Sequence, residues 1–244
     1  MESGSLRRGG ALALLLVTLG VLVCVVSFFL YLGSQGQDRL NGFLEEGRLH
    51  IQNEKPELAA KAFIKAEAEF NAILAFYQKA RGITGATFIS RAELAELTIS
   101  AAMLCCYDDF FHLKASPKWL ELAEQNFSNL EKFGNPSNPG GSAEPQAKEL
   151  GQNIATTREV STLCKLFSER KYNETMKGLL AAEKNAIPSD QDFFISEIRL
   201  LIACGKALNQ PAILQQAREL LFFLSYEAPI KSKKVDSLWG ILSR

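Results

Sequence analysis

The first candidates for catalytic side chains are two pairs of adjacent carboxylates, Asp108 with Asp109 and Glu45 with Glu46. Two carboxylates that face one site can act as general acid and general base. Adjacent residues on a helix, however, point about 100° apart, so neither pair is expected to face a common site. No glycine-rich phosphate loop follows a predicted strand. We therefore expect a protein that is not an enzyme.

Histidine is the second group that could do chemistry, and the chain has only two, His50 and His112. Neither has Cys or His partners at the spacing that zinc ligands require. Neither has a nucleophile nearby that it could activate as a base. The sequence predicts neither a metal site nor a cofactor.

The five cysteines are the remaining reactive side chains: Cys24, Cys105, Cys106, Cys164 and Cys204. Cys24 lies in an apolar stretch, and Cys105 and Cys106 are adjacent, which disfavours a bridge between them. A pair between Cys164 and Cys204 is the one disulfide to test if the domain lies outside the cytoplasm. The favoured interpretation is that the thiols are buried, free and act as small apolar side chains.

The clearest structural element in the sequence is an apolar N-terminal segment over residues 11–32. Arg7 and Arg8 precede it, and no further charge occurs before Asp38. As a helix the segment is about 33 Å long, enough to cross the hydrocarbon core of a bilayer. The sequence predicts a single transmembrane helix. A cleaved secretory signal, whose apolar region is about 7–15 residues, and a buried core helix are the alternatives.

The basic residues flanking the predicted span indicate its orientation. Arginines are retained on the cytoplasmic side, and Arg7 and Arg8 lie before the span. We expect a cytoplasmic tail over residues 1–10 and a domain outside the cytoplasm, which is the periplasm if the source is bacterial. Residues 33–42 would be a short tether, so partners would lie near the membrane.

Residues 38–244 carry 25 basic and 26 acidic residues, a balance that argues against nucleic acid as a partner. Apolar residues recur three and four positions apart, as in Leu58, Ala59, Ala62 and Phe63, which predicts an all-α domain. The segment 134–145 contains three glycines and three prolines and is expected to be a loop.

A spacing of small and bulky residues repeats along the helices. Gly47 precedes Ala59 and Phe63, and the last helix pair has Gly205 before Ala217 and Leu221. This pattern resembles the tetratricopeptide repeat. The resemblance implies antiparallel helix hairpins in a short α-solenoid. The loop over residues 134–145 would divide it into one half over residues 43–133 and a second over residues 146–244. Its final amphipathic stretch, which holds Trp239, is expected to cap the last hairpin.

The same resemblance implies a concave groove that binds protein or peptide partners through first-helix side chains. Carried over by position, the candidate groove residues are Val160, Cys164, Phe167, Arg199, Ile202 and Lys206. The organisation, with one span and a helical-repeat domain, is similar to ancillary translocon subunits of the bacterial inner membrane. We therefore expect a membrane-anchored scaffold that binds protein partners and assists in the handling of envelope or secreted proteins. The alternative is a helical ligand-binding component of an envelope transport system; the oligomeric state stays open.

Overall fold

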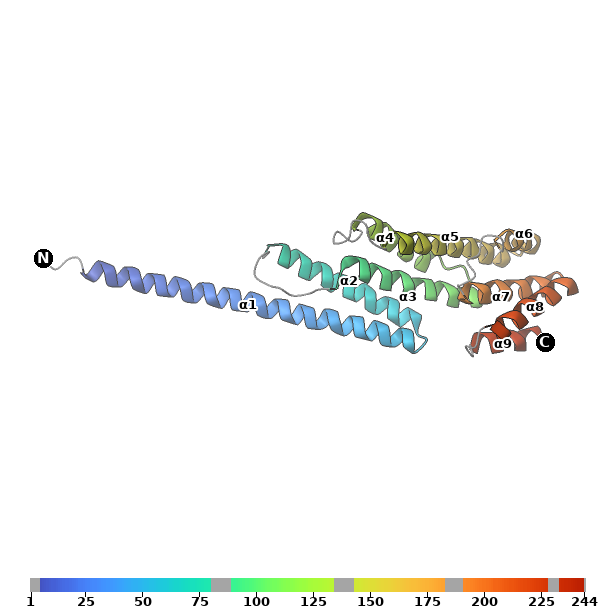
Figure 1. Cartoon of the computed structure of the whole chain (residues 1–244), viewed down its shortest axis with the longest axis horizontal. Helices are drawn as coiled ribbons and strands as arrows, with labels where there is room; N and C mark the ends of the chain where they lie inside the picture. The colour runs from blue at the N-terminus through green and yellow to red at the C-terminus, as the bar shows by residue number, and fades with distance from the viewer. Residues whose placement is uncertain (1–4, 80–88, 134–142, 183–190, 228–232, 244) are drawn as a thin grey trace. The chain divides into compact units, whose positions relative to one another are not determined.

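The computed structural model of the 244-residue chain describes residues 5–79, 89–133, 143–182, 191–227 and 233–243. Within these ranges the chain forms nine α-helices and no strands, which confirms the predicted all-α class (Figure 1). The helices are α1 (Ser5–Gln52), α2 (Pro56–Lys79), α3 (Arg91–Phe111), α4 (Pro117–Phe133), α5 (Ala143–Ser168), α6 (Tyr172–Ala182), α7 (Gln191–Ala207), α8 (Pro211–Glu227) and α9 (Lys233–Leu242).

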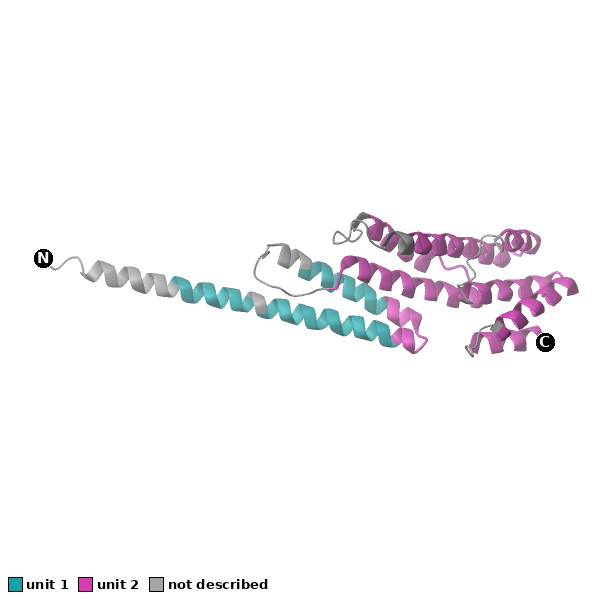
Figure 2. Cartoon of the chain, in the orientation of Figure 1, with its two compact units in different colours: residues 1–49, 61–87 teal, residues 50–60, 88–244 magenta. Residues whose placement is uncertain are grey.

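The chain divides into two compact units (Figure 2). Unit 1 comprises residues 1–49 and 61–87, and unit 2 comprises residues 50–60 and 88–244. The predicted loop over residues 134–145 lies outside the described residues up to position 142, and residues 143–145 already belong to α5. A division of the chain at that loop stays a prediction.

Unit 1 contains most of a helical hairpin in which α1 runs without a break past the apolar segment. Residues 33–42, expected as a tether, are helical and continue α1. Gly33, Gly36 and Leu40 are buried and follow one another at helical spacing. A Cβ atom at Gly36 would lie 3.0 Å from Cγ1 of Ile73 on α2. Gly36 therefore lets α2 approach α1 closely and does not interrupt the helix.

Closer to the turn between α1 and α2, the same hairpin has one apolar and one ionic contact. Phe63 of α2 is fully buried and packs directly over Gly47 of α1. On the solvent side, Arg39 Nε lies 3.1 Å from Glu69 Oε1. Exposed ion pairs contribute about 0.2–1 kcal/mol at most, so the ring of Phe63 is the main contributor to stability here.

The part of α1 that precedes the hairpin has the exposure expected of a membrane span. The candidate span that the structure describes is Thr18–Gln52, and only 12% of its most apolar window is buried. Leu22, Val23, Phe28 and Tyr31 are between 56% and 61% exposed. α1 is thus long and apolar enough to cross a membrane, and its low burial is unlike that of a core helix.

Unit 2 is built from consecutive antiparallel helix pairs. α3 packs on α4, α5 on α6 and α7 on α8, and α9 packs on both α7 and α8. The first helices of the pairs also contact one another, α3 with α5 and α7, and α5 with α7. The core lies where these helices meet. Its largest fully buried side chains include Leu94, Ile99, Phe110, Val160, Leu179, Ile198, Leu200, Ile202, Leu221 and Leu238.

The turns that join the helix pairs share one backbone conformation. In the turns after α1, α3, α5 and α7, the second residue beyond the end of the helix has a left-handed φ. These residues are Glu54 (φ 56°), Leu113 (φ 59°), Arg170 (φ 61°) and Asn209 (φ 51°). They are the only non-glycine residues with positive φ in the described parts of the chain.

The hydrogen bonds of these turns are equivalent as well. In the turn after α5, the Arg170 N–H donates to the Phe167 carbonyl at 2.9 Å, and the Lys171 N–H donates to the Leu166 carbonyl at 3.0 Å. The same two bonds occur in the other three turns. This is the Schellman motif, which satisfies the last carbonyls of a helix and reverses the chain. Four hairpins are therefore closed by the same device.

We expect Arg170→Gly to raise the free energy of unfolding by about 0.5–1 kcal/mol, because a Cβ atom is unfavourable in the left-handed region and glycine removes it. Arg170 is exposed, so little else changes. Arg170→Ala is the matched control, since it shortens the side chain but keeps the Cβ atom. Urea denaturation of the three proteins measures the difference. Equal stability of the Gly and Ala variants would contradict the conformational argument.

Candidate functional site

Three of the six predicted groove residues lie in the core of unit 2. Val160 is 1% exposed, and Cys164 and Ile202 are completely buried. The prediction assumed that the faces of the first helices line an open concave surface. Here α3, α5 and α7 pack against one another, so those faces are interior. These three residues therefore do not form an accessible binding surface.

The other three predicted groove residues make separate contacts. The Phe167 ring lies 5.2 Å from the Tyr172 ring, centroid to centroid, across the turn between α5 and α6. Arg199 Nε donates to the Phe111 carbonyl at 3.2 Å, and burial lowers the pKa of this guanidinium.

Lys206 completes the set. Its Nζ donates to the carbonyl of Ile241 in α9 at 2.6 Å. The Arg199 bond ties α7 to the end of α3, where the last carbonyls of a helix lack intrahelical donors. The Lys206 bond likewise ties α7 to the end of α9. Both cations thus hold helices together, a role that the sequence pattern did not indicate.

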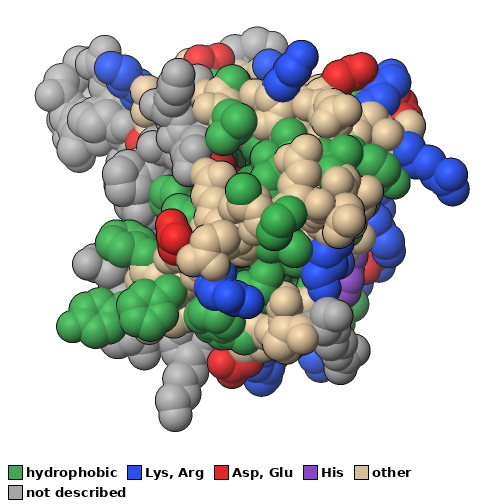
Figure 3. Space-filling model, turned by 90° about the vertical axis from the view of Figure 1, so that its right-hand side faces the viewer, with side chains coloured by type: hydrophobic (Ala, Val, Ile, Leu, Met, Phe, Trp, Pro, Cys, Tyr) green, Lys and Arg blue, Asp and Glu red, His purple; other side chains and the backbone are tan. Residues whose placement is uncertain are grey.

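An open, largely apolar surface of unit 2 lies instead between α8 and α9. There a cavity of about 500 Å³ is lined by aromatic and polar side chains. We call this surface the aromatic groove; its residues are Gln215, Arg218, Glu219, Phe222, Phe223, Tyr226 and Trp239. Figure 3, which views the molecule from the right-hand side of Figure 1, shows hydrophobic side chains on the surface among charged ones.

The helical period of α8 explains why its aromatic side chains are exposed. Ala217 and Leu221, four residues apart, are fully buried and face the core. Phe222 and Tyr226 lie on an adjacent face, also four apart, and their rings stack at 6.5 Å with an interplanar angle of 10°. Phe223 follows on a further face. One helix therefore presents aliphatic residues inward and three aromatic rings outward.

The opposite wall of the groove comes from α9, which has two different faces. Leu238 and Leu242 are buried, as expected of a helix that caps the last hairpin. Trp239 instead lines the groove, and its Nε1 donates to Ser225 Oγ on α8 at 3.2 Å. The same serine donates to the Leu221 carbonyl at 2.7 Å. The predicted capping role therefore applies to the leucines, whereas Trp239 also faces a cleft.

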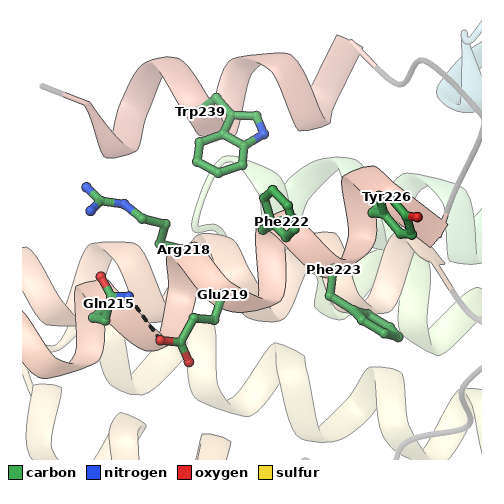
Figure 4. A pocket seen from close by; sticks show the side chains of 7 residues that line it. All are labelled: Gln215, Arg218, Glu219, Phe222, Phe223, Tyr226 and Trp239. Atoms are coloured by element: carbon green, nitrogen blue, oxygen red, sulfur yellow. Dashed lines mark hydrogen bonds between the residues drawn. The ribbon is translucent and has the colours of Figure 1, made fainter.

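The polar residues of the groove are arranged on two sides of α8 (Figure 4). Gln215 Nε2 donates to Glu219 Oε1 at 2.9 Å, and this pair points away from Trp239. Arg218 lies on the side of Trp239 and Phe222. The groove thus presents one cation beside two aromatic side chains.

A second cleft of unit 2 is ionic and fixes the start of α9. Lys234 Nζ lies 3.9 Å from Asp108 Oδ1 and 3.8 Å from Asp192 Oδ1, and Lys233 Nζ lies 3.3 Å from Glu54 Oε2. The neighbouring carboxylate, Asp109, accepts a hydrogen bond from a serine hydroxyl near α4. The adjacent aspartates therefore have separate structural partners and share no site. In the described residues, no group of three or more His, Cys, Asp or Glu side chains could hold a metal ion.

The four cysteines of unit 2 are buried free thiols. Burial raises the pKa of Cys105, Cys106 and Cys164 from 9.0 to about 12, and that of Cys204 to about 11. A thiolate would be desolvated in each position, so the folded protein keeps the proton. These side chains are suited to packing and poorly suited to nucleophilic attack.

These thiols predict a loss of stability at alkaline pH. Above pH 9.0 the unfolded chain releases thiol protons that the folded chain retains, so the free energy of unfolding falls as the pH rises from 9 towards 12. The stabilisation is present in full below pH 9. Denaturation at pH 8, 9, 10 and 11 measures the slope. Cys106→Ala should make the slope shallower than in the parent chain; an unchanged slope would contradict this assignment.

The chain was compared with protein-family models, with curated proteins and with solved structures, and none of them matches it. The class of protein is therefore defined by the described features alone. It is an all-helical chain with one helix long and apolar enough to cross a membrane, followed by paired helices and an exposed aromatic groove.

Proposed function

We propose that this protein is a single-pass membrane-anchored scaffold whose tetratricopeptide-like helical domain binds protein partners. The observation that carries the proposal is the continuity of α1, which is exposed and apolar at its beginning and packs in a helical hairpin at its end. One helix thus serves both as anchor and as the first member of the array. No flexible connection separates the two roles.

The membrane part of the proposal is supported by the exposure of apolar side chains in α1. Leu19, Leu22 and Val25 are 45% to 61% exposed, on more than one face of the helix. Leaving such side chains in water is unfavourable by about 1.5–3 kcal/mol each relative to burial. A bilayer would cover all faces at once, which a single neighbouring helix would not do.

The repeat part is supported by equivalent turns and by close approaches at glycine. Gly47 lies against Phe63 in the first hairpin, and Gly205 lies against Leu214 and Ile213 in the last. In both hairpins the glycine is on the first helix and the bulky side chain on the second. This is the arrangement that the tetratricopeptide resemblance implies.

The proposed orientation places the N-terminus in the cytoplasm and the helical domain outside it, because Arg7 and Arg8 precede the span. A reporter fused to the C-terminus tests this directly. Activity of a reporter that works only outside the cytoplasm is expected. Activity of a cytoplasmic reporter at the C-terminus would overturn the orientation.

Crosslinking in intact membranes, followed by mass spectrometry, tests the scaffold function. We expect recurring crosslinks between unit 2 and specific membrane or extracytoplasmic proteins, among them proteins involved in envelope or secreted protein handling. The alternative, a ligand-binding component of a transport system, predicts instead a small molecule that stays with the purified chain. Finding such a molecule and no recurrent protein neighbour would overturn the scaffold proposal.

A further inference from the structure

We propose that the aromatic groove between α8 and α9 binds an amphipathic helical segment of a partner protein, with an acidic residue of that segment placed beside Arg218. This inference rests on the proposed scaffold function and names the surface and the kind of segment that it would bind. Apolar anchor residues would supply most of the affinity, and the charge would select among segments.

The apolar part of the argument is the exposure of the rings. Phe222, Phe223 and Tyr226 are 65%, 61% and 83% exposed, although the neighbouring Leu221 is completely buried. Single exposed apolar residues are common, but a cluster of three aromatics beside a tryptophan marks an interaction surface. Aromatic residues are also the side chains that dominate binding energy when they become buried.

The shape of the groove favours a helix as the occupant. Its two walls are helices, with Phe222 on α8 facing Trp239 on α9 (Figure 4). α9 packs on α7 and α8 in the way that α7 packs on α5 and α6. Among the residues that the structure describes, no second helix packs on α9 as α8 packs on α7. A bound helix in the groove would extend the existing helix-to-helix interface.

Charge distinguishes an acidic segment from a basic one. Glu219 already accepts a hydrogen bond from Gln215 and points away from Trp239. Arg218 lies on the groove side of α8 and is exposed, and within the described parts of the chain it makes no ion pair. A carboxylate at the rim would therefore meet this exposed guanidinium, which can bind it through two parallel hydrogen bonds.

Photocrosslinking in intact membranes tests which occupant the groove takes. A photoreactive phenylalanine analogue replaces Phe223 in the full-length chain, and the same analogue at Leu180 on α6, which is 48% exposed, serves as the control position. We expect adducts at position 223 with a defined segment of another protein that has amphipathic helical spacing and an acidic residue. Adducts with lipid alone, or with a second copy of this chain, would overturn the inference.

Two substitutions distinguish specific binding in the aromatic groove from nonspecific binding to exposed aromatic side chains. Phe222→Ser should lower the adduct yield at position 223 about tenfold by removing the ring that faces Trp239 across the groove. Arg218→Glu should lower it about fivefold, and a Glu→Lys or Asp→Lys change in the captured segment should restore it. No loss with Arg218→Glu, or no restoration, would overturn the charge assignment. Protein adducts elsewhere on unit 2, without any at position 223, would overturn the inference that the aromatic groove is the binding site. The scaffold proposal would then still stand.

Discussion

Replacing both Leu19 and Leu22 with arginine is expected to release the chain from the membrane fraction. Each arginine near the centre of a span costs about 2.5–3.5 kcal/mol, whereas each leucine or valine contributes only about 0.3–0.6 kcal/mol. Two arginines therefore offset most of what the apolar segment provides. Both leucines are more than half exposed, so the substitution does not open a packed core. Pelleting after an alkaline carbonate wash measures the fraction retained.

The matched control for this prediction replaces Leu49 and Leu58 with arginine. These leucines are 55% and 43% exposed and lie beyond the apolar segment, near the turn between α1 and α2. We expect this double variant to stay in the pellet like the parent chain. If the two double variants behave alike, the apolar segment is not the anchor.

The second large effect is expected at Gly47, where alanine should lower the free energy of unfolding by about 1–3 kcal/mol through overpacking. A Cβ atom there would lie 2.7 Å from Cζ of the fully buried Phe63, so either the ring or the helix must move. Limited proteolysis between α1 and α2, together with urea denaturation, measures the loss. Because Phe63 is fully buried in a packed core, its ring has little free space into which it could move.

Gly42 on the same helix provides the control for Gly47. A Cβ atom at Gly42 would meet no atom within 4 Å. Gly42→Ala should therefore stabilise the chain by about 0.5–1 kcal/mol, since glycine is unfavourable within a helix. Opposite signs for the two alanine variants are the expected result. A gain in stability for both would show that α1 and α2 do not approach as closely as described.

The helical class and the pairing of the helices could be predicted because they depend on local spacing. Gly47 and Phe63, for example, are separated by a distance along the chain that is set by one short turn. The end of the first helix could not be predicted in the same way. Gly33 and Gly36 look like helix breakers in the sequence, but both are buried within α1. Close packing there outweighs the low helix propensity of glycine.

The burial of three predicted groove residues, Val160, Cys164 and Ile202, has a different cause. Val160 and Ile202 were assigned to an open surface by their position in a repeat, yet contacts among α3, α5 and α7 bury them. Those contacts join residues far apart in sequence, such as Phe111 and Arg199, and no local pattern encodes them. The aromatic groove could have been found only partly. Phe222, Phe223 and Tyr226 lie on more than one face of a helix, so they cannot all pack against one core. Periodicity alone does not say which of these faces is exposed.

The repeated Schellman turns also bear on how the chain folds. Each turn brings together helices that are neighbours in sequence, so each hairpin closes a short loop at a low entropic cost. Contacts of this kind form quickly, and domains emerging from the ribosome fold from the N-terminus onward. The hydrogen bond from Arg199 to the Phe111 carbonyl spans 88 residues and requires two hairpins to be in place. Hairpin formation should therefore precede the closure of the core between α3 and α7.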